Sequence, residues 1–259
     1  MSIAVQKLSF SYGAHRVLSD VTFTASEGAL LAVLGPNGVG KSTMFRCMLG
    51  LMNDYTGTVA VNGTAIRTLS ARQMARRIAY IPQSYYPTFH YSVLDMVLMG
   101  TAHQLSPFAL PGSEQTDIAR QALAQVGVEH LAARSFHRLS GGEQQLTMIA
   151  RALAQQAGIL VMDEPTSNLD FGNQLRVLSC IQRLAADGYT VLLSSHNPQH
   201  ALTYADRILA LIDGKGAADG SPRDVLTEAL LMQLYGVQTS IVDTADGRVI
   251  VPRTGGGQG

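Results

Sequence analysis

The chain has 259 residues, of which 46% are hydrophobic and 15% charged, and 19 basic against 19 acidic residues give a formal net charge of +0. The hydrophobic share excludes intrinsic disorder over most of the length, and the balanced charge argues against a surface that coats nucleic acid. No apolar run approaches the roughly 18 to 20 residues of a membrane-spanning helix, so we expect no membrane crossing by this chain itself. Cys47 and Cys180 lie far apart without paired spacing, which favours buried, inert thiols in a reducing cytosol.

The predicted strands are of two kinds. Alternating, β-branched segments at 3–26 and 56–66, with turn signals at Gly57 and Asn62-Gly63, predict a small antiparallel sheet. Unbroken apolar runs, typical of parallel strands that are buried on both faces, lie at 29–34, 77–81, 159–162, 191–193 and 208–212. Helical patterns separate these runs at 40–49, 146–153 and 175–184. This alternation predicts a wound α/β fold.

A helical region interrupts the alternation at about 92–138. Ser92 with Asp95 resembles a capping box, and Ser113 is expected to cap a helix that ends at Gly127. We therefore expect an all-helical insertion there.

The last part of the chain carries its own signals. Ser221-Pro222 predicts the start of a helix that runs to about Gly236, and Asp246-Gly247 predicts the turn of a hairpin. A glycine-rich tail, Gly255 to Gly259, follows. We expect one domain at 1–236 and a C-terminal hairpin with a flexible tail at 237–259.

A glycine-rich loop follows the apolar run 29–34 and opens a helix. It matches the pattern G-x-x-x-x-G-K-[ST], whose backbone N–H groups wrap a phosphate chain at a helix N-terminus. Lys41, one of the few lysines, would reach the β- and γ-phosphates, and Ser42 would ligate Mg²⁺. The alternative is an ordinary glycine turn with an exposed lysine. The predicted phosphate-binding residues are Gly35, Asn37, Gly38, Gly40, Lys41, Ser42 and Thr43.

Two carboxylates follow the apolar run 159–162 at the end where α/β sheets bind ligands. Asp163 is expected to hold Mg²⁺ through water, and Glu164, on the other face, to polarise the attacking water as general base. The alternative is a strand end with solvated acids.

The segment Leu139-Ser140-Gly141-Gly142-Glu143 precedes an amphipathic helix. Together with the glycine-rich loop and the Asp-Glu pair, in this order and spacing, it resembles the signature motif of ATP-binding-cassette (ABC) transporter ATPases. The resemblance covers about residues 1–235. It implies a P-loop NTPase with a RecA-like core and a parallel-rich sheet, and it implies ATP and Mg²⁺ as cofactors.

Further positions match the family's pattern. Tyr12 is similar to the aromatic residue that stacks on adenine, although a lone surface tyrosine is the alternative. Gln83 resembles the glutamine that senses Mg²⁺ and the nucleophilic water; the alternative is an ordinary loop glutamine. His196 resembles the histidine that contacts the γ-phosphate, and Asp170 lies in a segment similar to the loop that crosses to a second subunit.

The resemblance also implies partners. Two copies would form a head-to-tail ATP sandwich, in which Ser140, Gly141 and Gly142 of one copy bind the γ-phosphate held by the other. The aromatic segment Tyr85 to Tyr91 would dock membrane permease subunits, unless its rings bury in the helical insertion. A periplasmic or surface binding protein would take part indirectly. No nucleic acid is expected, and the chain would lie peripherally on the cytoplasmic face of the inner or plasma membrane.

Two segments, 92–100 and 169–174, look like those of importers for iron–siderophore, haem, cobalamin and oxyanion cargo. The alternatives are the ATPase of an exporter and a soluble ABC protein that acts on DNA or ribosomes. Long coiled-coil heptads between Lys41 and Leu139 would indicate the DNA class, and a second signature the ribosome class; the sequence has neither. His196 and His200 lack a third zinc ligand, and Arg151 is expected to form a structural ion pair near the site.

Overall fold

The computed structural model describes residues 1–85, 87–106, 109–245 and 247–253. Its centre is a six-stranded sheet in the order β10-β9-β3-β8-β7-β6. The five strands from β9 to β6 are parallel, and β10 is antiparallel to β9. The strands are β3 (Leu30–Leu34), β6 (Ile78–Ile81), β7 (Ile159–Met162), β8 (Thr190–Ser195), β9 (Arg207–Ile212) and β10 (Lys215–Gly220). All five predicted apolar strands are confirmed, whereas β10 was not predicted because its sequence lacks an apolar run.

Both faces of this sheet are buried, which explains the unbroken apolar runs. In β3, Leu31 and Val33 face one hydrophobic cluster, and Leu30, Ala32 and Leu34 face another. A strand that is covered on both sides has no solvent face for polar residues. The sequence pattern and the packing therefore agree.

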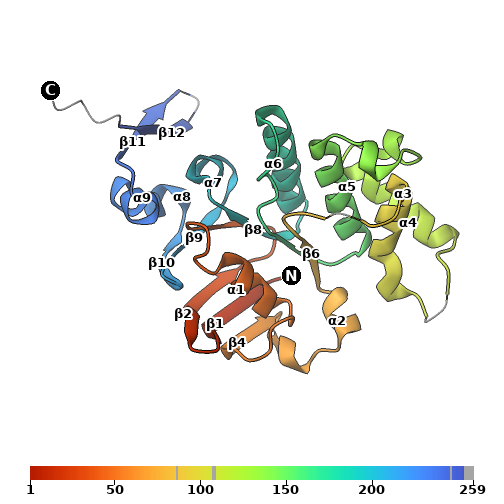
Figure 1. Cartoon of the computed structure of the whole chain (residues 1–259), viewed down its shortest axis with the longest axis horizontal. Coiled ribbons are helices and arrows are strands. Elements are labelled where there is room, and N and C mark those ends of the chain that lie inside the picture. The colour runs from red at the N-terminus through yellow and green to blue at the C-terminus, as the bar shows by residue number, and fades with distance from the viewer. Residues whose placement is uncertain (86, 107–108, 246, 254–259) are drawn as a thin grey trace.

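The first cluster joins the central sheet to an antiparallel sheet in the order β2-β1-β4-β5, which confirms the predicted small sheet. Figure 1 shows β1, β2 and β4 together with α1 at one end of the molecule. Met44 and Phe45 of α1 are fully buried in the same cluster. The elements are β1 (Ile3–Tyr12), β2 (His15–Ala25), α1 (Lys41–Met48), β4 (Thr56–Val61), β5 (Thr64–Ala65) and α2 (Ala71–Ala75).

The second cluster lies under the helices on the other face of the sheet. In Figure 1, α3, α4 and α5 gather at the side of the molecule opposite α8 and α9. The main helices here are α3 (Val93–Leu98), α4 (Ser113–Gln125), α5 (Gly141–Ala154), α6 (Phe171–Ala186) and α7 (Pro198–Tyr204). Short 3-10 helices at 99–104, 129–131 and 136–138 complete the predicted helical insertion.

The helix caps confirm one prediction and correct another. The Ser92–Asp95 capping box is present, with Asp95 N–H donating to Ser92 Oγ over 3.1 Å and Ser92 N–H to Asp95 Oδ2 over 3.1 Å. Ser113 was predicted as the cap of α4, which is wrong by one residue. Gly112 has the extended backbone of an N-cap and donates its N–H to Gln115 Oε1 over 3.0 Å.

The C-terminal segment contains two helices where one was predicted. These are α8 (Pro222–Val225) and α9 (Glu228–Tyr235). The chain breaks between them because Leu226 is extended and buried, and Thr227 then caps α9 by accepting from Leu230 N–H over 3.1 Å. Gly236 ends α9 in the left-handed conformation, as glycine does at helix ends.

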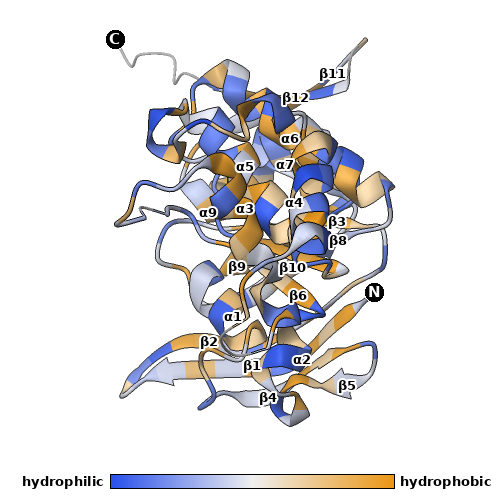
Figure 2. Ribbon diagram, turned by 90° about the vertical axis from the view of Figure 1, so that its right-hand side faces the viewer, coloured by the Kyte–Doolittle hydropathy of each residue, from blue (hydrophilic) through white to orange (hydrophobic). Residues whose placement is uncertain are grey.

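A hairpin of β11 (Thr239–Thr244) and β12 (Gly247–Pro252) follows, as predicted. Asp246 and the tail Gly255–Gly259, for which a turn and flexibility were predicted, lie outside the described residues. Within the described ranges, no helix combines the length and apolar character that spanning a bilayer requires. Figure 2 shows that the hairpin lies at the end of the molecule opposite the antiparallel sheet.

Candidate active site

Four neighbouring strands of the central sheet end at one edge and deliver polar residues there. The glycine-rich loop 35–42 follows β3, Gln83 follows β6, Asp163 and Glu164 follow β7, and His196 follows β8. The four strands are parallel, so their carboxyl ends meet at one edge, the usual ligand site of α/β sheets. The sheet order places β8 between β3 and β7, which brings His196 close to both the loop and Glu164.

The loop after β3 has the backbone of an anion cradle. Gly38 and Gly40 have φ angles of 81° and 109°, a region that favours glycine. A Cβ on Gly40 would lie 2.9 Å from Leu18 Cδ2, so the close approach of β2 also requires glycine there. No side chain caps α1 at Gly40. The N–H groups of its first turn are therefore available to a phosphate.

A cavity of about 260 Å³ lies over this loop. Its lining residues are Asn37, Gly38, Gly40, Lys41, Ser42, Thr43, Gln83 and Glu164. All eight were predicted site residues, so the structure brings half of the predicted set to one cavity. Ser42 and Gln83 line the same cavity, and their side chains carry the oxygen ligands that suit a hard cation such as Mg²⁺ beside a bound phosphate.

Lys41 is buried at the floor of this cavity. Its Nζ donates to Gly35 O over 2.7 Å and to Pro36 O over 3.1 Å, and it lies 3.5 Å from Glu164 Oε1. Burial lowers the pKa of Lys41, while Glu164 acts in the opposite direction. The lysine is therefore held inside the site, and the exposed lysine of the alternative interpretation is wrong.

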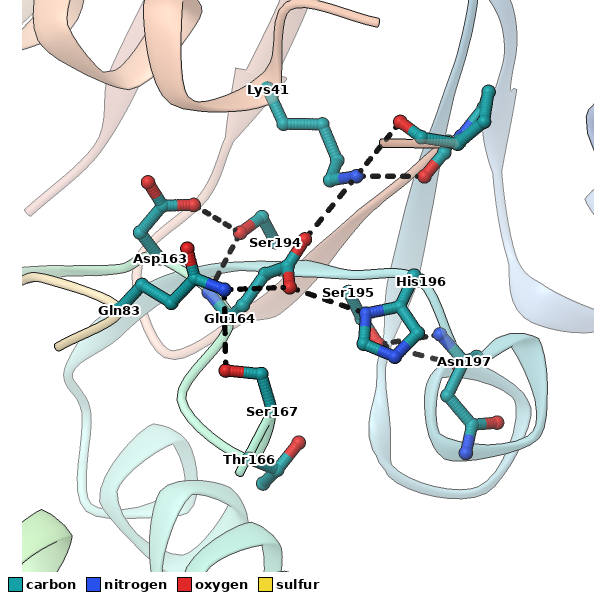
Figure 3. Close-up of polar contacts among 12 residues, drawn as sticks. Lys41, Gln83, Asp163, Glu164, Thr166, Ser167, Ser194, Ser195, His196 and Asn197 are labelled. Carbon is teal, nitrogen blue, oxygen red and sulfur yellow. Dashed lines mark hydrogen bonds and ion pairs between the residues drawn. The ribbon is translucent and has the colours of Figure 1, made fainter. Parts of the chain in front are cut away.

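Glu164 is the centre of the polar network drawn in Figure 3. Its Oε2 accepts from Gln83 Nε2 over 3.3 Å and lies 3.2 Å from His196 Nδ1. The backbone of Glu164 has a φ of 46°, a costly conformation for a residue other than glycine. Its N–H donates to Ser194 Oγ over 2.8 Å, which stabilises this backbone position. Three strands thus orient one carboxylate toward the cavity.

Asp163 points away from Glu164, as Figure 3 shows. Its Oδ1 accepts from Ser194 Oγ over 2.6 Å, and its Oδ2 accepts from Tyr80 OH over 3.5 Å. Burial, with the negative charge of Asp163 adding, raises the pKa of Tyr80 to about 12. Asp163 does not line the cavity, so direct ligation of an ion there is not supported by its position. Ser194 and Tyr80 were not predicted as site residues, although a hydroxyl within the apolar strand β8 was an available signal.

The segment 139–143 forms a separate cluster with the start of α6. Ser140 caps α5 in a capping box with Glu143. A Cβ on Gly142 would lie 2.2 Å from Asn173 Oδ1, so the two helix starts approach as closely as glycine allows. Asp170 caps α6, accepting from Asn173 N–H over 2.9 Å. Ser140, Gly142 and Asp170 do not line the phosphate cavity, and Gly141 lines a different cavity of about 100 Å³.

Tyr12 also lies outside the phosphate cavity. It ends β1, is 46% exposed and packs edge-on against Phe10 with ring centroids 4.8 Å apart. The exposed ring is accessible to a planar ligand.

The aromatic segment after Gln83 is partly exposed. Phe89 is 67% exposed, whereas Tyr85 and Tyr91 are half-buried against the helical cluster. Tyr86, which was predicted to join this surface, lies outside the described residues. The predicted ion pair of Arg151 is wrong: among the described residues, Arg151 forms no ion pair. Its guanidinium lies over the Tyr85 ring, 5.0 Å from the centroid, because an aromatic face, not a carboxylate, is its neighbour.

Comparisons with known proteins agree with this geometry. The model of the family described as ABC transporter matches residues 18–167. An ABC transporter ATP-binding protein of Haemophilus influenzae, named as uncharacterized, is 40% identical over 91% of this chain and 89% of its own length. The hemin import ATP-binding protein HmuV of Bordetella pertussis is 38% identical over 97% of this chain and 99% of its own length.

Solved structures give the same result. An inward-facing metal-chelate type ABC transporter aligns with a TM-score of 0.86 and 34% identity, covering 97% of both chains. The ADP form of an ATP-binding cassette named MJ1267 aligns with a TM-score of 0.82 and 25% identity over 91% of this chain. These similarities extend beyond the glycine-rich loop to nearly the whole chain.

Proposed function

The chain belongs to the ABC transporter family as an ATP-hydrolysing subunit, and we propose that it powers the import of a metal chelate. The observation that carries the enzymatic part is the position of Glu164, held by Lys41, Gln83 and His196 beside a phosphate cradle. The import part rests on similarity, over nearly full length, to a protein named for hemin import and to a metal-chelate type transporter. Haem, cobalamin, iron–siderophore or a related metal/oxyanion chelate is the proposed cargo class.

Each site residue has a proposed role in hydrolysis. The loop 35–43 binds the phosphates, and Lys41 exchanges its contacts with Gly35 O and Pro36 O for phosphate oxygens. Glu164 accepts a proton from the water that attacks the γ-phosphorus, as the bond to the β-phosphate oxygen breaks and ADP leaves. Gln83 and His196 orient the Glu164 carboxylate, and His196 would contact the γ-phosphate of a bound nucleotide. Tyr12 stacks on the adenine.

Mg²⁺ is the proposed metal: Ser42 and Gln83 would hold it, and Asp163 would reach it through water. Such an ion would neutralise charge on the phosphate oxygens during hydrolysis. The firm bond from Ser194 to Asp163 supports an outer-sphere position for that carboxylate.

A second copy of the chain is proposed to complete each site. The signature residues Ser140, Gly141 and Gly142 and the loop residue Asp170 do not line the phosphate cavity of their own chain, and Gly141 lines the neighbouring cavity that also includes Gln83 and Glu164. Their separation supports a head-to-tail dimer in which α5 of one copy points its N-terminus at the γ-phosphate bound by the other. Closure on ATP and opening after hydrolysis would then drive the membrane subunits.

The proposed assembly lies on the cytoplasmic face of the membrane. Permease subunits contact the segment Tyr85–Tyr91 and the helical insertion, and a binding protein delivers cargo on the other side. The exposed ring of Phe89 supports this placement.

The first test of this function is Glu164→Gln. The amide keeps the shape of the side chain but cannot accept a proton, so we expect ATP binding to persist while turnover falls by about 10² to 10⁴. Equilibrium nucleotide binding and phosphate release measure the two effects separately. Glu114→Gln, an exposed carboxylate in the first turn of α4, is the matched control and should leave both unchanged. Normal turnover in Glu164→Gln would show that Glu164 is not the general base.

A further inference from the structure

We propose that the C-terminal hairpin of β11 and β12 positions His196 in the active site, and that Gln199 is the positioning residue through which it acts. This inference rests on the proposed role of His196 in hydrolysis.

The side-chain amide of Gln199 makes two hydrogen bonds to the backbone of the hairpin. Its Oε1 accepts from Ile250 N–H over 2.9 Å, and its Nε2 donates to Arg248 O over 3.1 Å. Alternate residues of a strand direct their backbone groups to the same side, so Arg248 and Ile250 present one free donor and one free acceptor. β12 is an edge strand of a two-stranded sheet. The amide of Gln199 therefore replaces a missing strand partner along the edge of β12.

Gln199 lies only three residues after His196, in the first turn of α7. Asn197 caps this turn, because its Oδ1 accepts from Gln199 N–H over 2.9 Å and from His200 N–H over 3.3 Å. Asn197 N–H in turn donates to Ser195 Oγ over 3.0 Å at the end of β8. His196 thus lies in the two-residue connection between β8 and α7. The hydrogen-bonded first turn of α7, which contains Gln199, anchors the end of this connection.

The ring of His196 needs such an anchor. Its side chain is 52% exposed, so packing leaves much of the ring unconstrained. Its Nδ1 lies 3.2 Å from Glu164 Oε2. Because few side chains surround the ring, the backbone between β8 and α7 decides whether this contact forms.

The hairpin is itself held firmly enough to act as the anchor. Ile241 and Ile250 pack against the main hydrophobic cluster. Glu228 of α9 accepts from Ile241 N–H over 3.3 Å and pairs with Arg253 over 3.3 Å. Tyr235, the last residue of α9, packs against the same cluster, and burial, with the charge of Glu164 adding, raises its pKa to about 12. Hydrogen bonds and packing therefore connect α9 to the hairpin, and the hairpin to α7.

The test compares full-length variants by steady-state ATP hydrolysis. Gln199→Ala removes both bonds to the hairpin, and we expect kcat to fall about 3- to 10-fold with KM for ATP changed less than about 2-fold. Gln199→Glu keeps the acceptor for Ile250 N–H and should lose less. Thr203→Ala is the matched control: Thr203 Oγ1 accepts from the same amide over 3.2 Å but, within the described residues, makes no hydrogen bond to the hairpin. It should keep the kcat of the parent chain.

A double-mutant cycle with His196→Ala separates this inference from the proposed function. If Gln199 acts through His196, adding Gln199→Ala to His196→Ala should change kcat by less than about 1.5-fold, a coupling expected of residues in one network. Additive losses in the double mutant, or a parent-like kcat in Gln199→Ala with only a lower melting temperature, would overturn the inference. A parent-like kcat in His196→Ala would instead overturn the proposed role of His196.

Discussion

Glu164 and Asp163 are adjacent in the sequence, yet their environments are opposite. Glu164 faces the cavity and contacts Lys41, Gln83 and His196, whereas Asp163 is buried with Ser194 and Tyr80. Alternation along a strand end predicts that two neighbouring carboxylates point to opposite sides, and the structure confirms it. Their polar partners were harder to predict, because Ser194 comes from β8, thirty-one positions away from Asp163.

The buried thiol of Cys47 predicts that the protein loses stability at alkaline pH. Burial raises the pKa of its thiol from 9.0 to about 11. The folded state therefore keeps a proton that the unfolded state releases, so its contribution to stability is full below pH 9.0 and is lost as pH rises toward 11. The loss should reach about 2 to 3 kcal/mol of unfolding free energy.

Urea unfolding at several pH values checks this. Cys47→Ala should show a flatter decline than the parent chain between pH 9 and 11. Tyr80, whose pKa is also raised, is present in both proteins, so the difference isolates the thiol. Equal slopes would contradict the prediction.

Two of the serine capping boxes, those of α3 and α5, allow the contribution of a cap to be compared on two helices. Ser92 begins α3 with Asp95, and Ser140 begins α5 with Glu143. Replacing either serine with alanine should cost about 1 kcal/mol of stability through the lost cap. Ser140→Ala should in addition lower ATP turnover, because only Ser140 is proposed to bind a γ-phosphate. Thermal unfolding and phosphate release on both variants compare the two effects, and equal turnover would argue against a role of Ser140 beyond capping.

Helix starts and ends were predicted correctly where one or two nearby capping residues determine them. Gly236 and the Ser92–Asp95 box are examples. The break between α8 and α9 was missed because burial of Leu226, a tertiary effect, competes with the helical pattern around it.

For the whole molecule, the proposed shared site predicts contacts between chains. One preparation carries Asn37→Cys in the glycine-rich loop and another carries Gly141→Cys at the start of α5, both in the Glu164→Gln background. Mixing them with ATP and a short bifunctional thiol reagent should give cross-linked dimers, since Cys47 and Cys180 are buried and do not compete. Each preparation alone is the control. No cross-linked dimers in the mixture, or an equal yield of dimers from either preparation alone, would contradict the head-to-tail dimer.

The exposed end of the aromatic segment predicts a second contact, with the permease. Burying Phe89 at an interface could contribute about 1 to 3 kcal/mol, so Phe89→Ser should weaken co-purification with the permease and reduce transport. Basal ATPase activity and thermal stability should stay close to the parent values, because the ring is 67% exposed. Tyr85→Ser is the contrasting variant: it removes a half-buried ring beneath Arg151 and should lower stability. Unchanged assembly in Phe89→Ser would remove this ring from the docking surface.

The sequence by itself determined the features that short segments encode. The loop 35–42 is one contiguous motif between a strand and a helix, and the unbroken apolar runs follow from burial on both faces of the sheet. The tertiary structure decided which distant side chains meet. His196 reaches Glu164 because β8 inserts between β3 and β7, Arg151 meets Tyr85 instead of a carboxylate, and Gln199 pairs with the edge of β12. Strand order and helix packing set these contacts over long separations, and a local pattern carries no record of them.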